Sequence, residues 1–176
     1  MGAGTQPRLT SSRRWLFKRT LDAGCYGRAA KLAFYLHTAD AVEAQDPTLS
    51  RALCRIAKDE TRHYAFYRDV VKAHLDADAA YVIPLVGVLV QFQMPGRVMS
   101  DFEERSLMLA SEGVFGPEQY LDDVVDVVCA FWGVDELAAA VPEARRTVAR
   151  LRALRAGLKR LAKRLGGSAR QLSKTG

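Results

Sequence analysis

The sequence predicts an all-α protein, and three observations support this fold class. Apolar residues recur every three or four positions along two long stretches, 49–67 and 148–165, as they do on one face of a helix. Pro47 and Pro117 stand where first helical turns would begin, because proline is well tolerated there. Strand-like alternation of any length is absent from the sequence.

Length, composition and charge indicate one compact domain with basic ends. The chain has 176 residues, 49% of them hydrophobic, which suits a single domain with a sizeable core. The formal net charge is +6, yet residues 1–20 and 145–176 carry five and eleven basic residues and no acidic one. The stretch between them, 21–144, holds the other ten basic residues and all twenty acidic ones. Overall basicity is therefore no argument for nucleic-acid binding, and we expect no nucleic-acid partner.

The first 35 residues are expected to form a divergent, flexible and basic leader. Residues 12–18 resemble a twin-arginine export signal, but charges at Asp22, Arg28 and Lys31 interrupt the apolar segment that such a signal needs. The chain has three cysteines, Cys25, Cys54 and Cys129. Their odd number and the lack of a Cys-x-x-Cys pair indicate reduced thiols in a reducing compartment, so we expect a cytoplasmic protein.

Two helices are expected next, over 28–44 and from Pro47 onward. The first has a blurred apolar face, and Asp46 is suited to cap the second. Along the second helix, Glu60 and His63 lie on the same stripe as the apolar residues. The stripe is formed by Leu49, Leu53, Ile56, Glu60, His63 and Tyr67.

Glu60 and His63 are the candidate metal ligands, because positions i and i+3 of a helix share one face. A carboxylate on an apolar stripe is costly to bury unless it is paired or coordinated. Such a short motif also arises by chance, and the alternative is a partly exposed helix face with a surface histidine. The context of the motif decides between these two readings.

The second half of the chain continues the helical pattern. Residues 81–94 are almost uniformly apolar and predict a buried helix kinked near Pro84, too short and too interrupted for a transmembrane segment. Two further helices are expected over 101–111 and 117–132, and Gly113 separates them.

Residues 143–176 predict a basic amphipathic helix and a tail. Its apolar stripe could pack on the acidic body of the protein, and its basic face could dock onto an acidic partner. Attachment to an anionic membrane surface or to nucleic acid is the least favoured alternative.

Residues 56–70, around Glu60 and His63, resemble the fourth core helix of the soluble acyl-[acyl-carrier-protein] desaturases, particularly the actinobacterial type. The resemblance extends over roughly residues 38 to 165 with order and spacing kept. It continues through five further motifs, at 76–78, 92–96, 113–115, 120–125 and 132–137. The corresponding division of the chain is a leader at 1–35, a desaturase-like helical region at 36–142 and the basic helix and tail at 143–176.

The resemblance implies a ferritin-like helical bundle with a di-iron centre that inserts a double bond into a carrier-bound acyl chain. It implies iron as the cofactor, acyl carrier protein and a ferredoxin-type electron donor as partners, and fatty acid biosynthesis as the setting. Glu60 and His63 would be metal ligands, and Asp59 and Arg62 would orient them. Five apolar residues would be candidates for the wall of the acyl channel: Val82, Leu85, Val86, Leu89 and Phe92.

The sequence departs from the family pattern at the metal site. An ungapped count back from Glu60 to the position of the preceding ligand Glu reaches residues 26–28, which contain no carboxylate. The earlier ligand Glu and the first Glu-x-x-His pair also have no counterpart. We therefore expect a partial bundle that lacks the first core helices, as in a truncated desaturase, with an incomplete metal site.

Two functions remain open on these grounds. The first is a desaturase-like enzyme that is active only with a second chain. The second is a catalytically silent helical remnant that binds acyl carrier protein or a full-length homologue. Its unpaired apolar faces predict self-association or pairing with a homologue.

Overall fold

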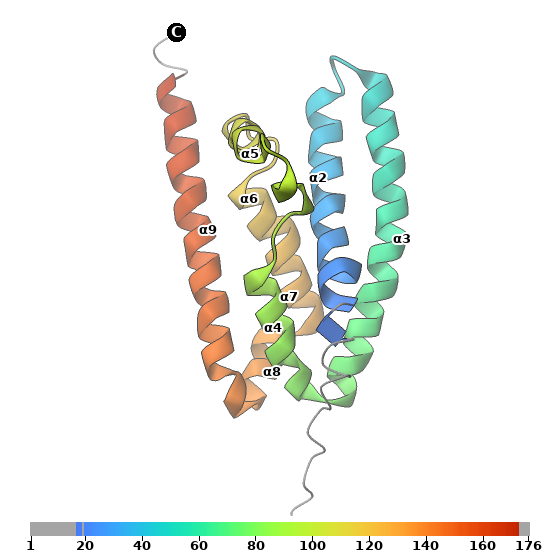
Figure 1. Cartoon of the computed structure of the whole chain (residues 1–176), viewed down its shortest axis with the longest axis vertical. Helices are drawn as coiled ribbons and strands as arrows, with labels where there is room; N and C mark the ends of the chain where they lie inside the picture. Colours follow the sequence, from blue (N-terminus) through green and yellow to red (C-terminus); the bar gives the residue numbers. More distant parts are fainter. Residues whose placement is uncertain (1–16, 19, 173–176) are drawn as a thin grey trace, which may run out of the picture.

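The computed structural model describes residues 17–18 and 20–172, and every regular element among them is helical (Figure 1). The all-α prediction is confirmed. The main helices are α2 (Gly27–Val42), α3 (Pro47–Ala77), α4 (Val82–Gln91), α5 (Phe102–Ser111), α6 (Pro117–Tyr120), α7 (Val127–Trp132), α8 (Val134–Ala140) and α9 (Arg145–Leu172). In Figure 1, α3 and α9 form opposite edges, and α2, α4, α6 and α7 lie between them.

Helices α2 and α3 form an antiparallel hairpin that begins with a π-helical segment, Thr20–Tyr26. The predicted break between the two helices is confirmed. The Asp46 carboxylate accepts hydrogen bonds from the backbone N–H groups of Thr48 and Leu49, at 3.1 and 2.9 Å. This N-cap satisfies two of the donors that a helix start leaves unpaired. The start of α3 is thereby fixed, and with it the register of the residues further along.

Helix α4 occupies the middle of the molecule and is largely buried. A single turn of 3₁₀ helix, Ala79–Tyr81, precedes it, and Pro84 lies in its first turn, where its missing N–H leaves no hydrogen bond unmade. The expected kink near Pro84 is therefore replaced by a helix start. Among the described residues, Ala79–Val98 is apolar and long enough by composition to cross a membrane. It is broken here into short pieces, which favours its role in the core.

Residues 117–132 form one continuous helical run, as expected, although its middle is π-helical (Leu121–Asp126). Gly133 ends the run with φ of 61°, a conformation that glycine adopts without steric cost. The short helix α8 follows and was not predicted. Helix α9 matches the predicted basic helix.

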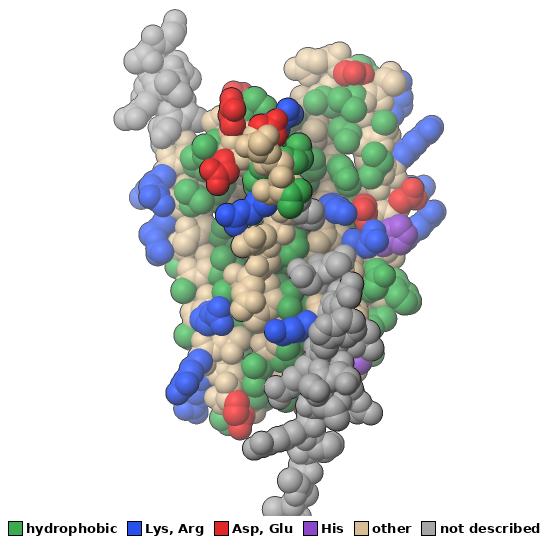
Figure 2. All heavy atoms as spheres, in the orientation of Figure 1, with side chains coloured by type: hydrophobic (Ala, Val, Ile, Leu, Met, Phe, Trp, Pro, Cys, Tyr) green, Lys and Arg blue, Asp and Glu red, His purple; other side chains and the backbone are tan. Residues whose placement is uncertain are grey.

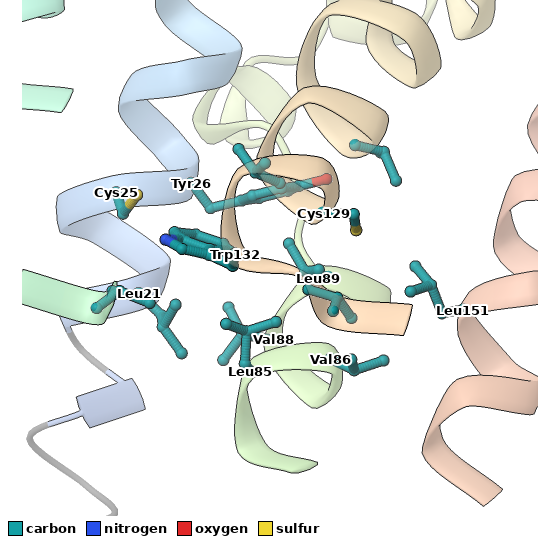
Figure 3. Packing of buried hydrophobic residues seen from close by; sticks show 14 of the residues in the cluster. Leu21, Cys25, Tyr26, Leu85, Val86, Val88, Leu89, Cys129, Trp132 and Leu151 are labelled. Carbon is teal, nitrogen blue, oxygen red and sulfur yellow. The ribbon is translucent and has the colours of Figure 1, made fainter. Parts of the chain in front are cut away.

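The apolar core joins α2, α3, α4, α6, α7, α8 and α9, whereas α5 has no buried residue. Figure 3 shows the packing of this core around Trp132. Trp132 is 2% exposed, and its Nε1 donates a hydrogen bond to the backbone carbonyl of Arg68, at 3.1 Å, which ties α7 to α3. Leu21, Cys25 and Tyr26 are buried in the same core.

The described part of the expected leader is helical and partly buried, and its expected flexibility stays a prediction. Its residues form the π-helical turn and the start of α2, because apolar side chains placed every three or four positions there find partners on α3, α4 and α7. The twin-arginine-like residues 12–16 lie outside the described part of the chain.

The apolar stripe of α9 packs on the body, as the first of the alternatives for this helix expects. Val148 and Leu151 are buried, and Arg155 bonds to Asp126 at 2.7 Å and to Asp135 at 3.1 Å. Several Lys and Arg side chains line the outer edge of the molecule along α9 (Figure 2).

Candidate metal site

The candidate ligands Glu60 and His63 lie near the middle of α3, on the side that contacts α2. Glu60 is only 14% exposed, whereas His63, one turn later, is 56% exposed. Glu60 Oε2 and His63 Nδ1 are 3.8 Å apart. The prediction that these two side chains share one face of a helix is therefore met by the geometry of α3.

A third side chain, Arg28 of α2, lies against both of them. Its Nη1 is 2.5 Å from Glu60 Oε2 and 3.0 Å from His63 Nδ1. A guanidinium only donates hydrogen bonds, so His63 must accept through Nδ1 and carry its ring proton on Nε2. The charge-assisted bond to Glu60 explains how a mostly buried carboxylate is tolerated here.

Asp59 and Arg62 lie on the exposed side of α3. They pair with each other, Asp59 Oδ1 to Arg62 Nη1, at 3.5 Å, and their side chains are 70% and 73% exposed. The structure does not bring either of them to Glu60 or His63, so their expected role in orienting the ligands stays a prediction.

The candidate channel residues belong to α4 and the residue after it. Val82, Leu85, Val86 and Leu89 are at most 1% exposed and form part of the central core. Phe92 packs edge-on against Tyr26, with ring centroids 4.7 Å apart. These contacts show core packing, and a role in lining an acyl channel stays a prediction.

The three cysteines are free, as expected. Cys25 and Cys129 are buried, and burial raises the pKa of each thiol to about 12. Cys54 is exposed on α3. Two of the three thiols are therefore held in the protonated, unreactive form at neutral pH.

The donors brought together here do not fit a di-iron centre. Within the described ranges, no group of three or more His, Cys, Asp and Glu side chains is placed to hold a metal ion. A guanidinium, itself a cation, lies against the two candidate ligands. We therefore derive no chemical step through iron at this position.

The role of Arg28 was missed by the sequence reasoning, although a signal was present. The ungapped count back from Glu60 ends at residues 26–28, and it found no carboxylate there. The basic side chain at this place, Arg28, contacts the two candidate ligands directly. A second missed contact joins His37 Nε2 to Asp123 Oδ2, at 2.7 Å, and ties α2 to the π-helical segment Leu121–Asp126.

A helical bundle in which a Glu-x-x-His pair on one long helix faces its antiparallel neighbour is the architecture of the ferritin-like carboxylate proteins. The sequence profile of the fatty acid desaturases matches residues 23–175, which includes α2, α3 and the other main helices. The chain belongs to the fatty acid desaturase family.

Two relatives of named function agree with this family. The chain is 34% identical over 92 residues to the putative acyl-[acyl-carrier-protein] desaturase DesA1 of Mycobacterium tuberculosis, which covers 52% of this chain and 27% of the relative. It is 27% identical over 158 residues to the chloroplastic stearoyl-[acyl-carrier-protein] 9-desaturase 6 of Arabidopsis thaliana, which covers 85% of this chain and 38% of the relative. The chain thus matches well under half the length of either relative. No solved structure matches it.

Proposed function

We propose that this chain is an acyl-[acyl-carrier-protein] desaturase-like protein of fatty acid metabolism that acts on, or binds, a carrier-bound acyl chain. The observation that carries the proposal is the family match over residues 23–175, which includes both helices of the candidate site. Both relatives described above are acyl-[acyl-carrier-protein] desaturases by name. A cytoplasmic location and a ferredoxin-type electron donor belong to the same proposal.

The basic edge of the protein is the proposed docking surface for acyl carrier protein. Arg152, Lys159 and Arg160 are exposed on α9, while the apolar stripe of the same helix is turned into the body. Opposite charge speeds the encounter with an acidic carrier protein and orients it. The acyl chain would then extend toward the apolar residues of α4.

Desaturation by this chain would require further metal donors from a second chain. The family's di-iron centre supplies the oxidation of an unactivated methylene, and this chain contributes at most Glu60 and His63. Helix α3 offers a surface for pairing, since Leu49, Ile56 and Phe66 are 43%, 44% and 64% exposed on it. Exposed apolar side chains along one edge helix are typical of an interface with another chain.

The proposal is tested by carrier binding and by desaturation. Binding of a fluorescently labelled acyl carrier protein is compared between wild type and Arg152→Glu/Lys159→Glu, with Arg55→Glu/Lys58→Glu on α3 as a control of equal charge change. We expect at least about a tenfold loss for the α9 variant and little change for the control. Equal losses would indicate nonspecific attraction and contradict the docking surface.

Desaturation is measured with stearoyl carrier protein and a ferredoxin system, with the chain alone and co-purified with a full-length homologue. Double-bond formation that depends on this chain in the mixed complex supports an enzymatic role. Its absence, together with carrier binding, supports the second candidate function, a catalytically silent module. The contact of Arg28 with both candidate ligands favours this second candidate.

A further inference from the structure

The feature that the family assignment does not explain is the guanidinium between the candidate ligands. One nitrogen of Arg28, Nη1, contacts an oxygen of Glu60 and a ring nitrogen of His63. These are the atoms that would face a metal ion bound by the pair. The lone pair of His63 Nδ1 is engaged by the guanidinium, and so is one carboxylate oxygen of Glu60.

The position of Arg28 is supported from both helices. Its guanidinium lies 5.9 Å from the centre of the Tyr67 ring, in cation–π geometry. Gly24, one turn before Arg28, leaves room for that ring, because a Cβ on residue 24 would lie 2.7 Å from Tyr67 Cδ1. The Arg28 side chain is 28% exposed, and its Nε is buried without a hydrogen-bond partner. Its contacts to Glu60 and His63 are therefore the polar contacts that hold the guanidinium in place.

We propose that Arg28 takes the place of a metal cation, so that Glu60, His63 and Arg28 form a metal-free ion-pair site which excludes divalent metal. A divalent ion bound to Glu60 and His63 would lie beside the guanidinium, and like charges at this distance repel strongly outside bulk water. Metal binding would therefore require the Arg28 guanidinium to leave its position against Glu60 and His63. The inference rests on the contacts of this chain and not on its proposed function.

The test is the binding of Co²⁺, followed by visible absorption and calorimetry on tag-free protein. All variants carry Cys54→Ser, which removes the exposed thiol as a competing ligand. Arg28→Gln removes the cation and keeps a polar side chain, and Arg28→Lys is the matched control that keeps the charge. Arg28→Met is a second cation-free variant that adds no carboxylate ligand, used in case Arg28→Gln does not fold as judged by circular dichroism.

We expect Co²⁺ to bind Arg28→Gln or Arg28→Met at least about fivefold more tightly than it binds wild type or Arg28→Lys. The gain should be lost when Glu60→Gln is added. A smaller difference, or no measurable binding to any variant, would overturn the inference. Carrier binding and desaturation are separate readouts, so failure of the proposed function would not be confused with failure of this inference.

Discussion

The Arg28–Glu60 ion pair should contribute measurably to stability, because it links α2 to α3 across a partly buried surface. The two side chains are 28% and 14% exposed, and the bond is 2.5 Å long. A hydrogen bond to a charged group contributes about 1.5–3 kcal/mol, and removal of one partner leaves the other charge poorly solvated. We therefore expect Arg28→Gln and Glu60→Gln each to cost about 1–3 kcal/mol, with a coupling energy of about 1–2 kcal/mol in the double variant.

The coupling energy is measured by a double-mutant cycle from urea unfolding at low and high salt. The control cycle uses Lys72 and Asp76 of α3, an ion pair whose side chains are 41% and 60% exposed. That exposed pair should show a coupling of about 0.5 kcal/mol or less. If the two cycles give the same coupling, the Arg28–Glu60 pair is no more than a solvated surface contact, and the reasoning from burial is wrong.

Three further predictions concern glycine and cysteine positions. Gly24→Ala should destabilise the protein by about 1–3 kcal/mol, because the new Cβ would lie 2.7 Å from the ring of Tyr67. Gly87→Ala in α4 should stabilise it by about 0.5–1 kcal/mol, because no atom lies within 4 Å of the new Cβ and alanine favours a helix. A melting temperature that rises for Gly24→Ala and falls for Gly87→Ala would contradict both predictions. In native protein at pH 8, a thiol reagent should modify Cys54 rapidly and leave Cys25 and Cys129 unmodified until unfolding; rapid modification of all three would contradict their burial. Stability should also fall between about pH 9 and 12, because the two buried thiols have a pKa of about 12 when folded and about 8.5 when unfolded. A urea midpoint that stays constant across this range would refute the linkage.

The raised pKa values of the two buried thiols explain why stability falls, and does not rise, at alkaline pH. The folded-state pKa of each buried thiol is raised, so the thiol stays protonated in the folded protein while it ionises in the unfolded chain. The contribution to stability is complete below the unfolded pKa and is lost as the pH rises toward the folded pKa.

The sequence by itself determined the helical class and most of the helix boundaries. The Asp46–Pro47 start of α3 was predictable because a capping side chain and a first-turn proline act locally, within a few residues. The shared face of Glu60 and His63 follows from helical periodicity in the same way. The family also was recognisable, since the motifs along residues 38–165 keep their order and spacing.

Only the tertiary structure decided what the candidate site contains. Arg28 is 32 residues from Glu60 in the chain, and its contact with Glu60 exists because α2 and α3 pack as an antiparallel hairpin in one register. The burial of Leu21 and Cys25 also depends on partners from distant helices, so the described part of the predicted leader joined the core. Local sequence patterns specify helices and their faces, whereas the neighbour of each face is set by packing between segments far apart in the chain.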